Sequence, residues 1–251
     1  MAQFPKITKM LIILASALIG GCSLLLFLIF LYVRSFGWIN LGLSKPMELA
    51  FDSMLCMVFF VQHSTMIRKS FKNRLCKIIP AYYHGAVYSI TSGTILLILI
   101  VLWQDSHHLL FSLTGELRWI LRIIFFLSIG IFVWGCLSLG SFDFFGIQPI
   151  LTRIQCTKDP DISLVIRGPY RWVRHPLYMA MLLLIWSCPD ISIERLLFNI
   201  LWTGWIIVAT LLEERDLVNE FGAEYIEYKR KVPILFPWRL KPLAPSPSTS
   251  Q

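Results

Sequence analysis

The sequence predicts an all-α protein, a polytopic transmembrane helix bundle of about six spans with a short C-terminal helical hairpin and a cytoplasmic C-terminal module. Of its 251 residues, 56% are hydrophobic and only 15% are charged, whereas about 25% of the residues in an average soluble domain are charged. The hydrophobic residues recur in long runs. This composition excludes an ordinary water-soluble globule, and it is far too apolar for a disordered chain.

Each span is predicted from an apolar run, because a helix needs about 20 apolar residues to cross a hydrocarbon core of about 30 Å. The six runs are Met10–Val33, Leu49–Val61, Ala86–Trp103, Ile120–Leu139, Leu177–Trp186 and Leu196–Leu212. The fifth run is too short to span upright, so we expect it to tilt or to pair with the sixth as a shallow hairpin. Pro189 predicts the turn between these two runs.

The distribution of basic residues predicts the orientation. The net charge is +8, which in a soluble protein would suggest nucleic acid, but here the positive-inside rule accounts for it. With the N-terminus in the cytoplasm, 18 Lys and Arg residues lie inside and 5 lie outside. We therefore expect an integral protein of the bacterial inner membrane with both termini in the cytoplasm and no nucleic-acid partner.

The domain organisation is expected to be simple. Residues 1–240 are predicted to form a single integral membrane domain, and the Pro/Ser-rich tail at 241–251 is predicted to be disordered. The six cysteines show no CxxC spacing, so neither disulfides nor a metal site is expected. Nothing in the sequence predicts the oligomeric state.

Two polar segments, 167–178 and 213–228, flank the last two apolar runs. A hairpin would bring them together at the cytoplasmic face, where charged groups are costly unless they are paired or functional. Arg174 and His175 could bind a carboxylate, and Glu213 and Glu214 suit an ammonium group. Alternatively, the arginines anchor the chain to anionic lipid and the glutamates form a solvated helix face.

Aromatic side chains complete this set of groups. Tyr170, Trp172 and Tyr178 offer ring faces for a flat base or a cation, and Pro176 is suited to the first position of the following helix. A ligand with a carboxylate, an ammonium, a cation and a purine is S-adenosylmethionine. A phospholipid headgroup would use similar groups, so composition leaves both ligands open.

The C-terminal motif carries a family resemblance. Gly168-Pro-Tyr-Arg-Trp-Val-Arg-His-Pro-Leu-Tyr178, a helical hairpin, Glu213-Glu214 and then Phe221-Gly222, Tyr225, Tyr228 and Val232-Pro233 resemble the isoprenylcysteine carboxyl methyltransferase-like family. The resemblance covers 164–238 and implies an S-adenosylmethionine-dependent methyltransferase whose cofactor-binding module is this segment. It also implies that the cofactor pocket is lined by Tyr170, Arg174, His175, Pro176, Tyr178, Glu213, Glu214 and Tyr225.

A second resemblance concerns the acceptor. Gln62–Arg68 with Phe71-Lys72 is similar to the N-terminal half of NnrU-domain proteins, here 49–150, and Ser141–Ile147 and Leu212–Leu217 are similar to bacterial methanethiol S-methyltransferases. This implies S-methylation of a small thiol, methanethiol to dimethyl sulfide. The alternatives are an isoprenylcysteine carboxylate, a phospholipid amine or another lipophilic acceptor, and outside enzymes an NnrU-like membrane protein of nitrogen-oxide metabolism or a transporter.

Thiol methylation needs a thiolate, because the thiol is a poor nucleophile. His63 is the candidate general base, with Arg68 as its electrostatic partner and with Gln62 and Ser64 placed to orient it. His63 could instead cap the end of a helix or hydrogen-bond a neighbouring span. Asp143 could hold a partner or serve a helix terminus.

Overall fold

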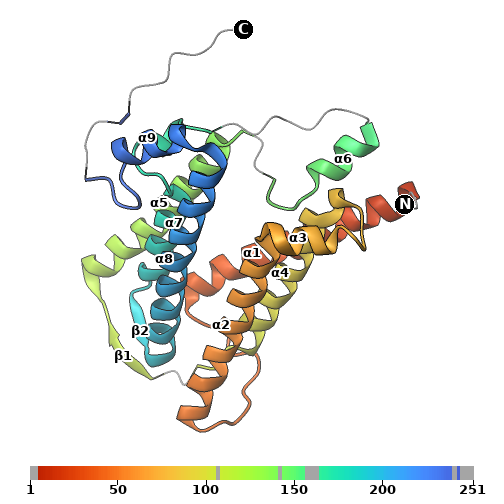
Figure 1. Cartoon of the computed structure of the whole chain (residues 1–251). Helices are drawn as coiled ribbons and strands as arrows, with labels where there is room; N and C mark the ends of the chain where they lie inside the picture. Colours follow the sequence, from red (N-terminus) through yellow and green to blue (C-terminus); the bar gives the residue numbers. More distant parts are fainter. Residues whose placement is uncertain (1–4, 106–107, 141–142, 156–163, 239–241, 244–251) are drawn as a thin grey trace. The chain divides into compact units, whose positions relative to one another are not determined.

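The computed structural model describes residues 5–105, 108–140, 143–155, 164–238 and 242–243 (Figure 1). The helices are α1 (Lys6–Val33), α2 (Lys45–Ile67), α3 (Lys69–Leu75), η1 (Ala81–Tyr83), α4 (His84–Leu102), α5 (Gly115–Ser138), α6 (Gln148–Gln155), η2 (Gly168–Arg171), α7 (Pro176–Trp186), α8 (Ile193–Phe221) and α9 (Ala223–Lys231). The strands are β1 (Leu109–Ser112) and β2 (Asp190–Ser192). Nearly all of the predicted disordered tail, like Ser141 and Phe142 of the second motif, lies outside the described residues.

Every predicted apolar run lies in a helix or ends within one residue of it, and five of these helices are long and apolar enough to cross a membrane. The fifth run forms α7, which has only 11 residues and is therefore about 16 Å long. The hairpin is supported by its contact with α8, because Trp186 donates through Nε1 to Thr203 Oγ1 at 3.0 Å. The count of six spans and the cytoplasmic position of the C-terminal module stay predictions.

The all-α prediction is wrong in one detail, because β1 and β2 pair in a two-stranded sheet. Arg118 at the start of α5 donates two hydrogen bonds to the Asp190 carboxylate, at 2.8 and 2.7 Å. These bonds hold the pKa of Asp190 below its ordinary value. Both segments are short and lie outside the apolar runs, so periodicity gives no strand signal there.

The chain packs as two compact units. The first comprises Met1–Leu110, Asp143–Pro160 and Ile191–Leu201, and the second comprises Phe111–Phe142, Asp161–Asp190 and Trp202–Gln251. Helix α8 begins in the first unit and ends in the second. The single domain at 1–240 predicted from the sequence stays a prediction.

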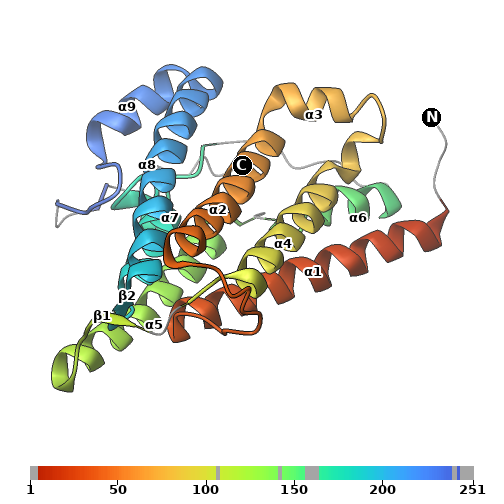
Figure 2. The same ribbon diagram turned by 90° about the horizontal axis from the view of Figure 1, so that it is seen from below.

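In the first unit, α4 packs against α1 and α2 (Figure 2). A cluster of aromatic rings fills the end of this bundle where α1 and α4 finish. Phe30 lies edge-on to Trp103 and to Phe198, with ring centroids 5.8 and 5.4 Å apart. Such pairs add to the free energy of burial, and Phe198 thereby ties the start of α8 to this bundle.

Charged residues are buried beside this aromatic cluster. Asp52 of α2 is fully buried and accepts the backbone N–H of Gln104 at 3.1 Å, and Arg34 pairs with Asp105 at 3.0 Å. Lys45 pairs with the fully buried Glu194. Because charges inside a membrane protein persist only when they are paired or solvated, the basic residues at the two ends of the loop after α1, Arg34 and Lys45, each have an acidic partner.

The Asp143–Gln148 turn is anchored to α1 and α4. Asp143 Oδ2 accepts the N–H of Gln148 at the start of α6, at 2.7 Å, and Ser16 Oγ of α1 donates to the Phe145 carbonyl at 2.6 Å. Gly146 has φ +64°, and a Cβ there would lie 2.0 Å from the Gly85 carbonyl carbon. Of the two roles left open for Asp143, the one observed is therefore that of accepting a backbone N–H at a helix terminus.

Gly20 should tolerate no larger side chain, because an added Cβ would lie 2.7 Å from both the Phe145 ring and Ser89 Oγ. We expect Gly20→Ala to destabilise the protein by about 1–3 kcal/mol through overpacking. Its neighbour Gly21 has only Phe145 Cζ nearby, at 4.0 Å, so Gly21→Ala should be neutral or stabilising by up to about 1 kcal/mol. Thermal unfolding of the two variants in one detergent checks this, and equal midpoints would contradict it.

In the second unit, α5 packs against α7 (Figure 1). Gly135 allows α5 to approach α7 closely, since a Cβ there would lie 2.7 Å from Leu177 Cδ2. Buried residues of α7 such as Ala180 and Ile185 form the centre of this packing. Helix α9 and the residues after it fold back to the start of α7 through the contacts described next.

Candidate active site

The segment before α7 is shaped by its glycine and prolines. Gly168 has φ +58°, and a Cβ there would lie 2.0 Å from Ser138 Oγ of α5. Pro169 is the second residue of η2, and its carbonyl accepts the N–H groups of Trp172 and Val173. Pro176 occupies the first turn of α7, where its missing N–H has no consequence. The Gly-Pro and His-Pro steps thus produce a tight corner that presents Arg174 and His175.

The corner is closed by backbone hydrogen bonds to the segment after α9. Arg174 N–H donates to the Pro233 carbonyl at 2.8 Å, and His175 N–H donates to the Ile234 carbonyl at 3.1 Å. Two parts of the C-terminal motif that lie about 60 residues apart are therefore adjacent.

Glu214 is the centre of the site. Its side chain is 4% exposed and accepts Arg174 Nε at 2.8 Å and Arg174 Nη2 at 3.0 Å, a bidentate pair. His175 Nε2 lies 2.8 Å and the Tyr225 hydroxyl 2.7 Å from Glu214 Oε1, and Lys229 Nζ lies 3.1 Å from Oε2. The two polar segments meet at this carboxylate, as the sequence predicted.

Arg174 is occupied by the protein itself. Besides Glu214, it donates through Nη1 to the carbonyls of Lys229 and Val232, at 2.8 and 2.6 Å. These carbonyls terminate α9, so the guanidinium satisfies acceptors that a helix end leaves open. Arg174 therefore holds α9 and Glu214 against the corner, and the carboxylate that it binds is the protein's own.

The neighbouring glutamates differ sharply in environment. Glu213 is about half exposed, with a side-chain exposure of 45%, and its Oε2 lies 3.7 Å from His175 Nδ1. The Tyr178 ring stacks on the His175 ring at a centroid distance of 5.6 Å. Glu213 and the partly exposed Tyr178 thus form the accessible edge of the network, whereas the His175 side chain, which is 4% exposed, lies with Glu214 in its interior.

Three tyrosines around the network stay protonated. Burial, together with the Glu214 carboxylate, raises the pKa of Tyr225 well above its usual value. Burial likewise raises the pKa of Tyr170 and of Tyr228, and Tyr228 donates to the Tyr170 carbonyl at 2.6 Å. The Tyr225 and Tyr228 hydroxyls are therefore fixed hydrogen-bond donors in this unit.

The two predicted catalytic residues belong to the first unit. His63 lies inside α2, a turn before its end, because the helix continues past the predicted apolar run Leu49–Val61. The Tyr88 hydroxyl of α4 lies 2.9 Å from His63 Nε2 and 3.0 Å from His63 Nδ1. Arg68 is the residue at which α2 ends and α3 begins. In the structure, His63 therefore hydrogen-bonds a neighbouring span, which was one of the alternatives left open by the sequence.

Sequence reasoning missed several partners in these clusters. Tyr88 contacts His63, Lys229 contacts Glu214, and the Val232 carbonyl contacts Arg174. The Val-Pro step was noticed only as part of the family motif. No local signal marks a carbonyl as the acceptor for an arginine about 60 residues away.

Comparison with known proteins gives the family. The chain is 34% identical over 197 residues to a methanethiol S-methyltransferase of Pseudomonas deceptionensis, with 78% of this chain and 75% of that protein covered. It is 30% identical to a methanethiol S-methyltransferase of Mycobacterium tuberculosis, with 74% and 76% covered. The chain belongs to this methyltransferase family.

More distant similarity places the family in a wider group. The chain is 33% identical over 93 residues to protein-S-isoprenylcysteine O-methyltransferase of Xenopus laevis, which covers 34% of this chain and 31% of that protein. No protein-family model matches the chain, and no solved structure matches it significantly. The chain is an integral membrane methyltransferase and so requires a methyl donor, which excludes a transporter as its primary role.

Proposed function

We propose that the protein transfers a methyl group from S-adenosylmethionine to a small thiol, most simply methanethiol to give dimethyl sulfide. The observation that carries the proposal is the similarity over about three quarters of the chain to enzymes named for this acceptor. The polar network of the second unit also supports it, because its accessible edge presents a carboxylate and an aromatic ring, which suit the ammonium group and the flat base of such a donor.

The edge of the network fits the donor chemically. The half-exposed Glu213 carboxylate suits the ammonium group, and the partly exposed Tyr178 ring, held by the buried His175 ring on which it stacks, suits a flat base or a cation. Tyr170, Pro176 and Tyr225 complete the proposed set of cofactor-binding residues. Arg174 and Glu214 act in this proposal by positioning these residues. S-adenosylmethionine supplies an electrophilic methyl group on a sulfonium.

The residues of the first unit are proposed to prepare the acceptor. His63 accepts the thiol proton on a ring nitrogen, with Tyr88 fixing the orientation of the ring, and Arg68 favours the resulting thiolate by its charge. The thiolate sulfur then forms the new bond to the methyl carbon. The electron pair of the broken carbon–sulfur bond stays on the donor sulfur, so two ions become two neutral thioethers.

A water-poor site favours this reaction. An anionic nucleophile and a cationic donor lose charge as they approach the transition state, and water stabilises the separated ions more than that state. An apolar helix bundle provides such surroundings, and a small uncharged thiol partitions into it. We place the protein in the bacterial inner membrane with both termini and the 164–238 module in the cytoplasm, where the donor would be available.

The direct test uses purified protein with methyl-labelled S-adenosylmethionine and methanethiol. We expect labelled dimethyl sulfide in the headspace and the demethylated donor in solution. Protein heated past its unfolding midpoint is the control. Absence of labelled product, with turnover of a prenylcysteine or a lipid, would overturn the choice of acceptor.

A lipophilic acceptor is the second candidate, and the partial similarity to an isoprenylcysteine O-methyltransferase favours it. Its acceptor would be a prenylcysteine carboxylate or a phospholipid amine. Competition separates the two candidates: excess prenylcysteine should suppress dimethyl sulfide formation only if both acceptors share one site.

A further inference from the structure

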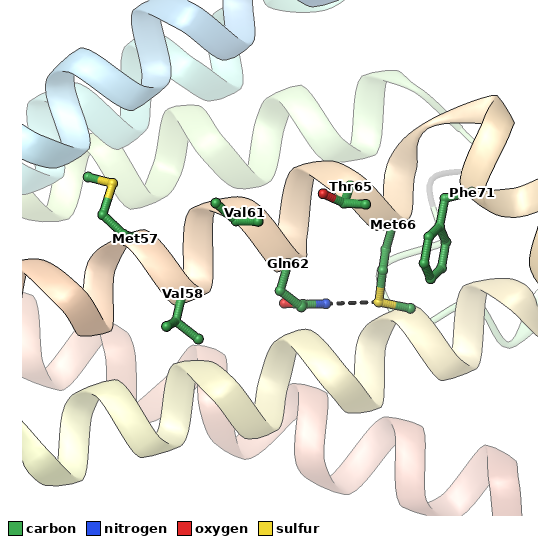
Figure 3. Close-up of a pocket in the computed structure, with 7 residues that line it drawn as sticks. All are labelled: Met57, Val58, Val61, Gln62, Thr65, Met66 and Phe71. Atoms are coloured by element: carbon green, nitrogen blue, oxygen red, sulfur yellow. Dashed lines mark hydrogen bonds between the residues drawn. The ribbon is translucent and has the colours of Figure 1, made fainter.

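An open groove of about 540 Å³ runs along α2 in the first unit. Its walls are formed mainly by Met57, Val58, Val61 and Met66 of α2 together with Phe71 of α3 (Figure 3). Figure 3 shows Met57 at one end of the groove and Phe71 at the other. The nine helical steps from Met57 to Met66 correspond to about 14 Å of helix, which is about half of the hydrocarbon core of a bilayer.

The groove is lined mainly by apolar side chains, and the one amide among them, that of Gln62, is bonded within the protein. The Gln62 amide donates through Nε2 to Ser92 Oγ at 3.1 Å and to Met66 Sδ at 3.0 Å (Figure 3). Gln62 Oε1 is buried. The two methionines can adapt to an irregular chain, because their thioether side chains are flexible and polarizable. A flexible hydrocarbon chain is the occupant that this lining fits.

The Phe71 end of the groove is strongly basic. The segment 68–77 contains Arg68, Lys69, Lys72, Arg74 and Lys77 and no acidic residue. Lys72, which follows Phe71 directly, is exposed, as are Arg74 and Lys77. An apolar groove that leads to a cationic helix is complementary to a molecule with a hydrocarbon chain and an anionic headgroup.

We propose that this groove is a binding site for an anionic phospholipid, with one acyl chain along α2 and the phosphate headgroup at Lys72 and its neighbouring cations. Basic residues near a membrane surface contribute about 1 kcal/mol each to the attraction of anionic lipid, which corresponds to about a fivefold change in affinity. The site lies on the helix that carries His63. It does not depend on the methyl acceptor proposed above.

The test measures lipid binding to the full-length protein in detergent by native mass spectrometry, with no methyl donor or thiol present. Phosphatidylglycerol and phosphatidylcholine with identical acyl chains are the probes. We expect tighter binding of phosphatidylglycerol. Lys72→Gln should reduce that preference about fivefold, whereas Arg230→Gln, which removes an exposed charge from α9 in the second unit, should leave it unchanged.

The acyl-chain part of the proposal has its own variant. Val61 is 65% exposed, so Val61→Trp fills the groove without disturbing a buried contact, and it should weaken binding of both lipids at least tenfold. Met54→Trp adds the same ring to an exposed position of α2 outside the groove wall and should not. Equal affinity for the two lipids in the native protein, or unchanged binding by Val61→Trp, would overturn the proposal.

Discussion

Glu214→Gln is expected to destabilise the second unit by about 3 kcal/mol or more. Removing one partner of a buried ion pair leaves the other charge uncompensated, and here the Arg174 guanidinium would lose its bidentate carboxylate. Tyr225 and His175 would lose a charged acceptor at the same time. Thermal unfolding in detergent should show a lower midpoint, and methyl transfer should fall because the corner before α7 loosens.

The adjacent Glu213→Gln is the matched control, because it makes the same chemical change at a half-exposed position. Its unfolding midpoint should stay within error of the native protein, since exposed charges contribute little to stability. Calorimetry should instead show weaker binding of S-adenosylmethionine by about tenfold, the loss of one charge-assisted hydrogen bond. If Glu214→Gln unfolds like the native protein, the central role of that carboxylate is wrong.

Composition was enough to predict the spans, because bilayer thickness sets a length that apolar runs must meet. For this reason the run Met10–Val33 lies within a long helix, and the run Ile120–Leu139 ends one residue beyond another. Composition did not predict where the helices end. Helix α2 continues through Gln62 and His63 to Ile67, where the Gln62 amide nitrogen donates to Ser92 and Met66 and the His63 ring lies within hydrogen-bond distance of Tyr88.

The buried Asp52 shows what composition cannot reveal. It lies in a predicted span, yet its Oδ1 accepts the backbone N–H of Gln104, which follows the end of α4. The small sheet could not be predicted from the sequence either, because strands of three and four residues carry no usable periodicity. Both features depend on segments that are distant in the sequence.

The sequence predicted that the two C-terminal polar segments would meet. It did not predict which of their charged residues would pair within the protein. Arg174 and the glutamates were expected to bind ligand directly. The structure instead uses Arg174 and Glu214 to bind each other and to terminate α9. A sequence shows which charges lie near one another, but burial decides which of them can meet a ligand. Of Arg174, Glu213 and Glu214, the structure leaves only Glu213 substantially exposed. This arrangement separates a buried interior from an exposed edge.

His63→Ala should slow methyl transfer by about a hundredfold or more, the usual contribution of a general base. The affinity for S-adenosylmethionine should change less than twofold, because His63 belongs to a different unit from the proposed cofactor residues. Single-turnover kinetics with methanethiol and calorimetry with the donor give the two quantities. Added imidazole should restore part of the rate if the lost group is a proton acceptor.

Tyr88→Phe provides the comparison, because it keeps the ring and removes only the hydroxyl that lies 2.9 Å from His63 Nε2. Tyr88 acts as a positioning residue in this proposal. Loss of one hydrogen bond is worth about 1 kcal/mol, so we expect a rate about fivefold lower and no rescue by imidazole. Full turnover in His63→Ala would show that another group accepts the proton, whereas a rate lowered equally in both variants would indicate that the pair has only a structural role.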